Sequence, residues 1–236
     1  MRTLIYALFI GLMSVASAQV MAAADGIHLD KVEIDLSDKA SLQRGAKTFM
    51  NYCLSCHQAS YMRYNRMGKD LGMTDQQVKD NLMLASDKIG DTMTIAMRAQ
   101  DAQKWFGVVP PDLSVIARAK GTDYLYTYLR TFYLDPTKPM GTNNLAFKDV
   151  GMPHVLWEQQ GYKQRNEHGQ LETASKGSLS TSDYNNVVAD LVNFLAYIAE
   201  PTKIERVALG KWVLLYLIIF FLIAYPMKKA FWRDIH

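Results

Sequence analysis

The clearest chemical signal in this chain comes from its two cysteines, Cys53 and Cys56, which are followed at once by His57. Cys-Leu-Ser-Cys-His has the spacing used to attach c-type haem. One helical turn brings both sulfurs to the same side, where each forms a thioether with a haem vinyl group, and the imidazole lies under the iron. The spacing predicts one haem c, covalently attached through Cys53 and Cys56, with His57 as an axial ligand.

Other uses of the cysteine pair explain fewer of these residues. A structural disulfide or a thioredoxin-type redox pair leaves His57 without a role, and the sequence lacks the strand–helix alternation expected of that redox fold. A structural zinc site needs four ligands, and the sequence has no second cysteine pair. Haem attachment is the interpretation that uses all three residues.

A six-coordinate haem needs a second axial ligand, and a methionine thioether in that position raises the reduction potential. The chain has 13 methionines, and those at helical spacing are expected to fill the core. Met140 and Met152 differ, because both lie in an irregular, glycine- and proline-containing region that can carry a side chain across the haem face. The sequence pattern by itself favours neither Met140 nor Met152 as the second axial ligand. His154 is a less favoured candidate, which would bind through nitrogen.

The surrounding pattern predicts a mostly α-helical domain with long loops. Residues 135–180 are rich in turn-forming residues and are expected to be irregular, and no strand alternation stands out. Capping residues, apolar periodicity and helix-stopping prolines predict helices over residues 38–56, 74–85, 92–104, 111–119, 122–134 and 180–200.

The first 24 residues have the composition of a secretory signal peptide. Arg2 precedes an apolar run over residues 4–15, and small residues follow. The apolar run is shorter than the roughly 20 residues that a membrane span requires. Cleavage is expected after Ala24, with Ala18 as the alternative.

A second apolar segment, residues 207–227, lies near the other end of the chain. Lys211 is its single charge, and basic residues follow directly in the tail 228–236. Positive charge beyond a span favours the cytoplasmic side. We therefore predict a transmembrane anchor at 207–227, a cytoplasmic tail at 228–236, and a periplasmic domain at 25–206. The alternative, a buried core helix, rarely ends in a basic aromatic tail.

The formal charge of +3 belongs to the membrane tail and the signal segment rather than to the domain. Five of the 26 basic residues and one of the 23 acidic residues lie outside 25–206. The domain therefore has 21 basic and 22 acidic residues, a net charge of −1. No basic stripe is present for nucleic acid to bind. Residues 25–40 are acidic, and they are expected to be either a solvated arm or a docking surface for a basic cytochrome c.

Several separate motifs make the chain resemble the cytochrome c1 family, bacterial type, of the quinol–cytochrome c reductase (cytochrome bc1) complex. The similarity covers residues 41–236, and the Pro-Pro-Asp-Leu-Ser segment and the anchor distinguish the chain from small soluble cytochromes c. It rests on Gln43-Arg44-Gly45 ahead of the haem motif, Tyr64, Val109-Pro110-Pro111-Asp112-Leu113-Ser114 with Arg118, Gly151-Met152-Pro153, Ala199-Glu200-Pro201, and a closing Tyr225-Pro-Met-Lys-Lys-Ala-Phe-Trp232.

The resemblance implies roles for further site residues. It implies that Met152 is the sixth ligand, that Pro110 and Pro111 line the haem pocket, and that Arg118 pairs with a haem propionate. Many relatives have Ala-Pro-Pro after the ligand, whereas this chain has Pro153-His154-Val155. We therefore expect the loop after Met152 to differ. The extra disulfide of some bacterial relatives cannot form, because the chain has no further cysteines.

A haem with both axial positions filled passes single electrons and binds no substrate. The resemblance implies a monohaem cytochrome anchored in the bacterial inner membrane beside cytochrome b. It would carry one electron from the Rieske iron–sulfur protein to cytochrome c, without a catalytic site of its own. The alternatives are a single-haem subunit of a terminal oxidase, a haem protein with an open sixth position, and an anchored thiol–disulfide protein.

Overall fold

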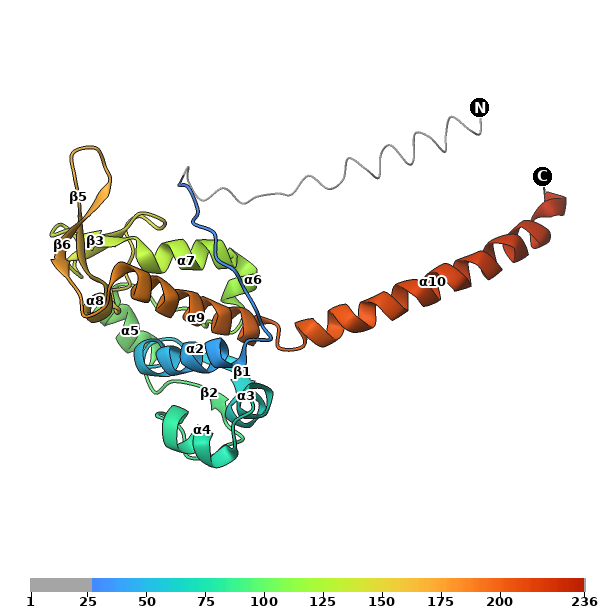
Figure 1. Ribbon diagram of the computed structural model, residues 1–236, viewed down its shortest axis with the longest axis horizontal. Coiled ribbons are helices and arrows are strands. Elements are labelled where there is room, and N and C mark those ends of the chain that lie inside the picture. The colour runs from blue at the N-terminus through green and yellow to red at the C-terminus, as the bar shows by residue number, and fades with distance from the viewer. Residues whose placement is uncertain (1–26, 236) are drawn as a thin grey trace.

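The computed structural model describes residues 27–235, so the predicted signal peptide and its two cleavage sites lie outside the described residues. A mostly helical domain is followed by one long helix that projects away from it (Figure 1). The helices are α2 (Lys39–Tyr52), α3 (Tyr64–Leu71), α4 (Asp75–Leu82), α5 (Ala99–Phe106), α6 (Ile116–Lys120), α7 (Thr122–Arg130), α8 (Trp157–Gln160), α9 (Thr181–Ala199) and α10 (Lys203–Phe231), with a terminal 3-10 turn, η1 (Arg233–Ile235).

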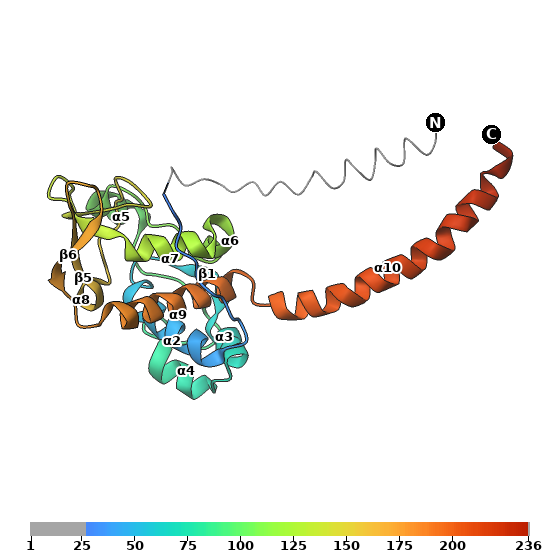
Figure 2. The ribbon, with the colours of Figure 1, turned by 45° about the horizontal axis from the view of Figure 1, so that its top comes forward.

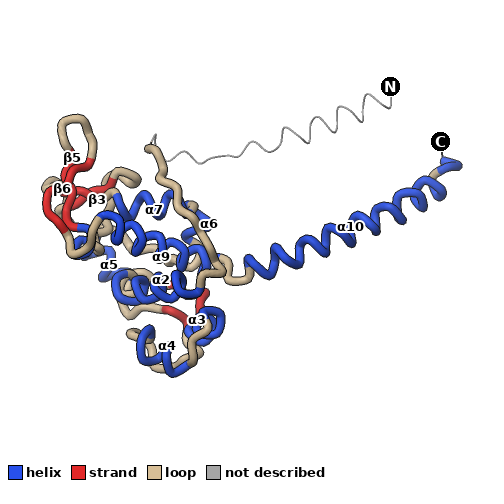
Figure 3. The backbone as a smooth tube through the Cα atoms, in the orientation of Figure 1, coloured by secondary structure: helices blue, strands red, loops and turns tan. Residues whose placement is uncertain are grey.

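Short strands connect the helices (Figure 3). Within residues 27–235 they pair into three two-stranded antiparallel sheets, β1 with β2, β3 with β4, and β5 with β6. The strands are β1 (Ala59–Arg63), β2 (Thr92–Met93), β3 (Phe132–Leu134), β4 (Thr142–Asn144), β5 (Gly161–Arg165) and β6 (Leu171–Lys176).

The core forms where α2 packs against α9. Phe49 and Phe194 meet there with ring centroids 5.5 Å apart, and both are fully buried. Gly45 allows this approach, because a Cβ at its position would lie 2.1 Å from the Asp190 carbonyl oxygen. Beside it the Arg44 guanidinium donates two hydrogen bonds, of 2.6 and 2.9 Å, to the Asp190 carboxylate. The motif around Gly45 therefore fixes the position of the helix that leads into Cys53.

Residues 27–38 run over α7 and across to α9 (Figure 2). The Asp30 carboxylate pairs with Arg130 at 2.6 Å, and Lys31 pairs with Asp123 at the same distance. The apolar side chains of Val32, Ile34 and Leu36 pack against the core. The acidic stretch therefore packs on the domain through its apolar side chains and two ion pairs, and its role as a docking surface stays a prediction.

The predicted helices at 74–85 and 180–200 are confirmed, with small differences at their ends. Thr74 and Gln77 form a reciprocal capping box at the start of α4, and the Ser180 hydroxyl accepts from the Asp183 amide at the start of α9. The helix predicted over 38–56 is capped by Asp38 and ends earlier, at Tyr52. Local side-chain patterns determine these starts, so sequence predicts them well.

The predictions for the middle of the chain are wrong in several places. Thr92–Met93 is a strand, and the helix expected from residue 92 begins only at Ala99. The helix expected over 111–119 is a single short one, Ile116–Lys120. Residues 132–134 leave the predicted helix to pair with β4, and 135–180 contain strands and α8 as well as loops. These strands form because they pair with segments elsewhere in the chain. Local residue propensity does not predict such pairing.

α10 is longer than the anchor predicted at 207–227. Its 29 residues span about 44 Å at helical rise, and its apolar side chains are exposed all round. Within residues 27–235 it is the one helix that is long and apolar enough to cross a membrane. A helix that is apolar on every face, and that buries no residue against the part of the chain that the structure describes, requires an apolar environment from outside.

Candidate haem site

The Cys-x-x-Cys-His segment follows α2 as one further turn of chain. The Cys53 carbonyl accepts from the amides of Cys56 at 3.0 Å and His57 at 2.8 Å, so the helical winding continues through the motif. Cys53 is buried and Cys56 is partly exposed, and both are free thiols. Burial, together with the neighbouring Cys56, raises the pKa of the Cys53 thiol to about 12. One turn thus presents two sulfurs and an imidazole, the donor set that haem attachment requires.

The imidazole of His57 is oriented by a backbone carbonyl. Its Nδ1 lies 2.8 Å from the Pro111 oxygen, and because a carbonyl only accepts, Nδ1 carries the proton. Nε2 is left with its lone pair for iron, an arrangement typical of metal-bound histidines. Burial lowers the pKa of His57, which keeps the ring neutral. The residues present therefore fit a haem, and Pro111 contributes its carbonyl to that fit.

Asp112 holds this proline segment beside the haem motif. One carboxylate oxygen accepts from the Ser114 amide at 2.7 Å and from its hydroxyl at 2.5 Å. The other accepts from the amide and the hydroxyl of Ser60, at the start of β1. Burial alone would raise the pKa of Asp112, but the hydrogen bonds from Ser114 and Ser60 hold it below its ordinary value. The Pro-Pro-Asp-Leu-Ser motif thus lies between His57 and α6, and the bonds of Asp112 hold it in place.

Two buried asparagines hold the loop that carries Met152. The Asn144 side-chain oxygen accepts from the amides of Ala146 and Phe147, at 2.8 and 3.2 Å. The Asn143 side-chain oxygen accepts from the amide of Asp149, which has a left-handed φ of 59°. A non-glycine residue in that conformation needs such support. These bonds fix the backbone just before Gly151-Met152.

The Met152 loop packs directly against the chain that leads to the proline pair. A Cβ at Gly151 would lie 2.6 Å from Cγ1 of Val108 and 3.1 Å from the Phe106 oxygen, so glycine is required for the approach. Residues 106–111 therefore contact His57 at one end, through Pro111, and the Met152 loop at the other. The structure brings the sequence-predicted His57, Pro110–Pro111 and Met152 segments into one region.

The other candidate ligands occupy different positions. Met140 lies beside Gly141 in the turn that joins β3 to β4. His154 is 5% exposed and stacks on Phe132, with centroids 5.1 Å apart, so it belongs to an aromatic cluster. Arg118 is exposed on α6, and its pairing with a propionate stays a prediction.

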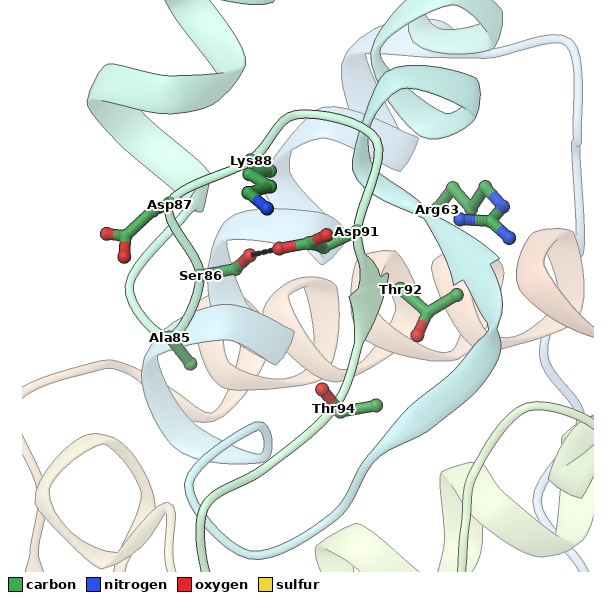
Figure 4. Close-up of a pocket in the computed structure, with 8 residues that line it drawn as sticks. All are labelled: Arg63, Ala85, Ser86, Asp87, Lys88, Asp91, Thr92 and Thr94. Atoms are coloured by element: carbon green, nitrogen blue, oxygen red, sulfur yellow. Dashed lines mark hydrogen bonds between the residues drawn. The ribbon is translucent and has the colours of Figure 1, made fainter.

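A polar hollow of about 520 Å³ lies on another part of the domain, around the loop before β2 (Figure 4). Its groups bind one another, since the Ser86 hydroxyl donates to Asp91 at 2.6 Å and Arg63 donates to the Gly90 carbonyl. It shares no lining residue with the proposed haem site. The haem site is thus defined by the motif segments and not by the cavity.

Sequence reasoning missed Tyr128, whose hydroxyl donates to the sulfur of Met152 at 3.3 Å, and also missed Asn143 and Asn144. The asparagine pair had a signal, because asparagine side chains often accept hydrogen bonds from backbone amides a few residues further along the chain. Tyr128 had none, because it lies 24 residues from Met152 on a helix that holds two other tyrosines.

Comparison with known proteins identifies the family. Residues 31–235 match the Cytochrome C1 family. The chain belongs to this family. It is 47% identical over 247 aligned positions to the cytochrome c1 of Allochromatium vinosum, with all of both chains covered. It is 27% identical over 229 positions to the cytochrome c1 of Rhodospirillum rubrum, covering 84% of this chain and 83% of that one.

A further relative has a different name. The ammonia monooxygenase gamma subunit of Nitrosomonas europaea is 48% identical over 228 positions, covering 95% of this chain and 97% of that protein. The chain described here has the Cys-x-x-Cys-His motif and an apolar C-terminal helix.

Membership confirms the predicted cofactor and function. Cytochrome c1 proteins carry one covalently bound haem c, and they are membrane-anchored electron-transfer subunits of the bc1 complex. The mostly α-helical c-type fold with one apolar C-terminal helix is likewise confirmed. The alternative, a terminal oxidase subunit, is not favoured.

Proposed function

We propose that this chain holds its haem through Cys53 and Cys56, with His57 and Met152 as the axial ligands. The observation that carries the assignment is the segment 106–111, which joins His57 to the Met152 loop by direct contact. Pro110 and Pro111 would line the haem pocket, and the exposed guanidinium of Arg118 would pair with a propionate.

The bound haem supplies a one-electron carrier. The chain's own residues determine how that carrier is held. The Pro111 carbonyl fixes which nitrogen of His57 is protonated, Asp112 braces the proline segment, and the asparagine pair positions the Met152 loop. If His57 and Met152 both bind the iron, substrate would have no access to the metal, so we assign the protein electron transfer and no bond-breaking step of its own.

We propose that residues 1–24 are removed on export, that 25–206 lie in the periplasm, and that the basic tail 228–236 is cytoplasmic. The exposed apolar surface of α10 supports an anchor within the bilayer, where it would contact cytochrome b. The haem domain would then receive an electron from the Rieske protein and pass it to a cytochrome c.

Purification of the affinity-tagged full chain from native membranes tests this proposal. We expect a reduced c-type spectrum, haem that stays with the polypeptide in denaturing gels, and co-purifying cytochrome b and Rieske protein. Replacing both Cys53 and Cys56 by Ala should abolish the covalent haem. Co-purification with monooxygenase subunits in place of cytochrome b would contradict the assigned partners. If protease added to intact spheroplasts cleaves a tag on the tail 228–236, the assigned orientation is contradicted.

A further inference from the structure

Tyr128 makes a contact that the proposed electron-transfer role does not use. Its hydroxyl donates a hydrogen bond to the sulfur of Met152, with 3.3 Å between oxygen and sulfur. A thioether sulfur is a weak acceptor with two lone pairs. If one lone pair binds iron, the other is free for the phenol proton, so the hydrogen bond and the iron bond do not compete for the same site.

The surrounding structure holds the donor in place. The Tyr128 ring stacks on Tyr124, with centroids 6.1 Å apart, and meets the edge of Phe132 at 5.2 Å. The backbone carbonyl of Tyr128 accepts from the Asn144 side-chain amide at 2.7 Å.

The acceptor is held by the same residue. Asn144 also fixes the start of the loop that carries Met152, through its bonds to the amides of Ala146 and Phe147. One buried side chain therefore ties the donor helix α7 to the acceptor loop. The hydrogen bond is built into the fold and does not depend on a flexible surface group.

We propose that Tyr128 is a positioning residue that raises the reduction potential of the haem through its hydrogen bond to the Met152 sulfur. This inference rests on the proposed assignment of Met152 as the axial ligand. The phenol proton draws electron density from the sulfur, so the thioether donates less to the iron. Ferric iron depends on that donation more than ferrous iron does, and the reduced state is therefore favoured.

The Tyr128→Phe variant of the full chain, purified in its membrane complex, provides the main test. It removes one oxygen and keeps the ring that packs against Tyr124 and Phe132. At a fixed electrode potential near the midpoint, the ratio of ferrous to ferric haem should fall about threefold. That change equals about 28 mV at 59 mV per tenfold for one electron. The far-red band that reports an iron–thioether bond should remain.

Tyr184→Phe is the matched control. The Tyr184 hydroxyl is also buried and also binds α7, but it donates to the Leu129 carbonyl at 2.8 Å and not to sulfur. This variant should lose stability without a change in potential. An equal shift in both variants would overturn the proposal, because general loosening of α7 would then explain it. An unchanged potential in Tyr128→Phe with the far-red band retained would overturn it as well.

A second variant covers the case in which Tyr128→Phe does not accumulate haem. Fluorotyrosine incorporated at position 128 keeps the shape and is a stronger donor, so the ferrous fraction should rise rather than fall. No shift there would overturn the proposal. A Met152→Leu variant with an unchanged far-red band and an unchanged potential would instead show that Met152 is not the ligand. This result distinguishes failure of the ligand assignment from failure of the Tyr128 proposal.

Discussion

At the scale of single residues, the identity of the axial methionine is the first assignment to test. Replacing Met152 by Leu removes the sulfur, and His57 and both thioether bonds remain. We expect a haem that stays attached, has a lower reduction potential and binds carbon monoxide in its ferrous form. Optical titration and a carbon monoxide difference spectrum measure both effects.

Met140→Leu is the matched control, because Met140 lies in the turn between β3 and β4. Its potential and spectrum should equal those of the parent. If Met140→Leu opens the sixth site and Met152→Leu does not, the ligand assignment is reversed.

Asp112 gives a prediction about pH. Asp112→Asn weakens the hydrogen bonds that the carboxylate accepts from Ser60. Because these are charge-assisted bonds in a partly solvated position, the domain should lose about 1 kcal/mol of unfolding free energy at neutral pH. The pKa of Asp112 lies below its ordinary value of 3.8 in the folded state. Its contribution is therefore complete above 3.8 and is lost as the pH falls through the folded-state pKa.

Denaturant titrations at pH 7 and in the acid range measure this difference between parent and variant. The gap should narrow as the pH falls below 3.8. Asp87→Asn, on the exposed loop before β2, changes charge without these bonds and should leave stability unchanged. A gap that stays constant down to the acid transition would show that the carboxylate charge contributes nothing.

At the scale of elements, the close packing of α2 on α9 depends on the absence of a side chain at Gly45. In Gly45→Ala the added carbon would lie 2.1 Å from the Asp190 oxygen and 2.7 Å from Cβ of Phe194, both parts of a rigid helix. The helices must separate, and we expect a loss of roughly 3 kcal/mol or more. Chemical denaturation of the haem-loaded domain measures the loss.

Gly90→Ala is the control for this change. No heavy atom lies within 4 Å of a Cβ at Gly90, so its stability should differ little from that of the parent. Equal stability of Gly45→Ala and the parent would mean that α2 and α9 adjust their distance without cost.

At the scale of the whole molecule, the domain and α10 are separable. α10 adds no buried residue to the domain, and all proposed haem ligands lie upstream of it. Deleting residues 207–236 should therefore release a soluble, haem-loaded domain into the periplasm. Haem staining of the periplasmic fraction after electrophoresis measures this release. A truncated product without haem would show that the anchor is needed for maturation as well as for attachment.

The cofactor, the anchor and the family could be predicted from the sequence because their signals are local. Cys53, Cys56 and His57 lie within five residues, an apolar span is a matter of length, and the capping box joins Thr74 to Gln77, three positions later. The strands at 92–93, 132–134, 142–144, 161–165 and 171–176 were missed, because each forms by pairing with another segment.

The interior of the site was decided only by the tertiary structure. Which nitrogen of His57 is protonated depends on a carbonyl 54 residues away, and the sulfur of Met152 meets a hydroxyl from α7. Gly45 matters because Asp190, far along the chain, passes beside it. Such contacts depend on how helices pack, and packing follows from the shapes of many side chains together and not from any local pattern.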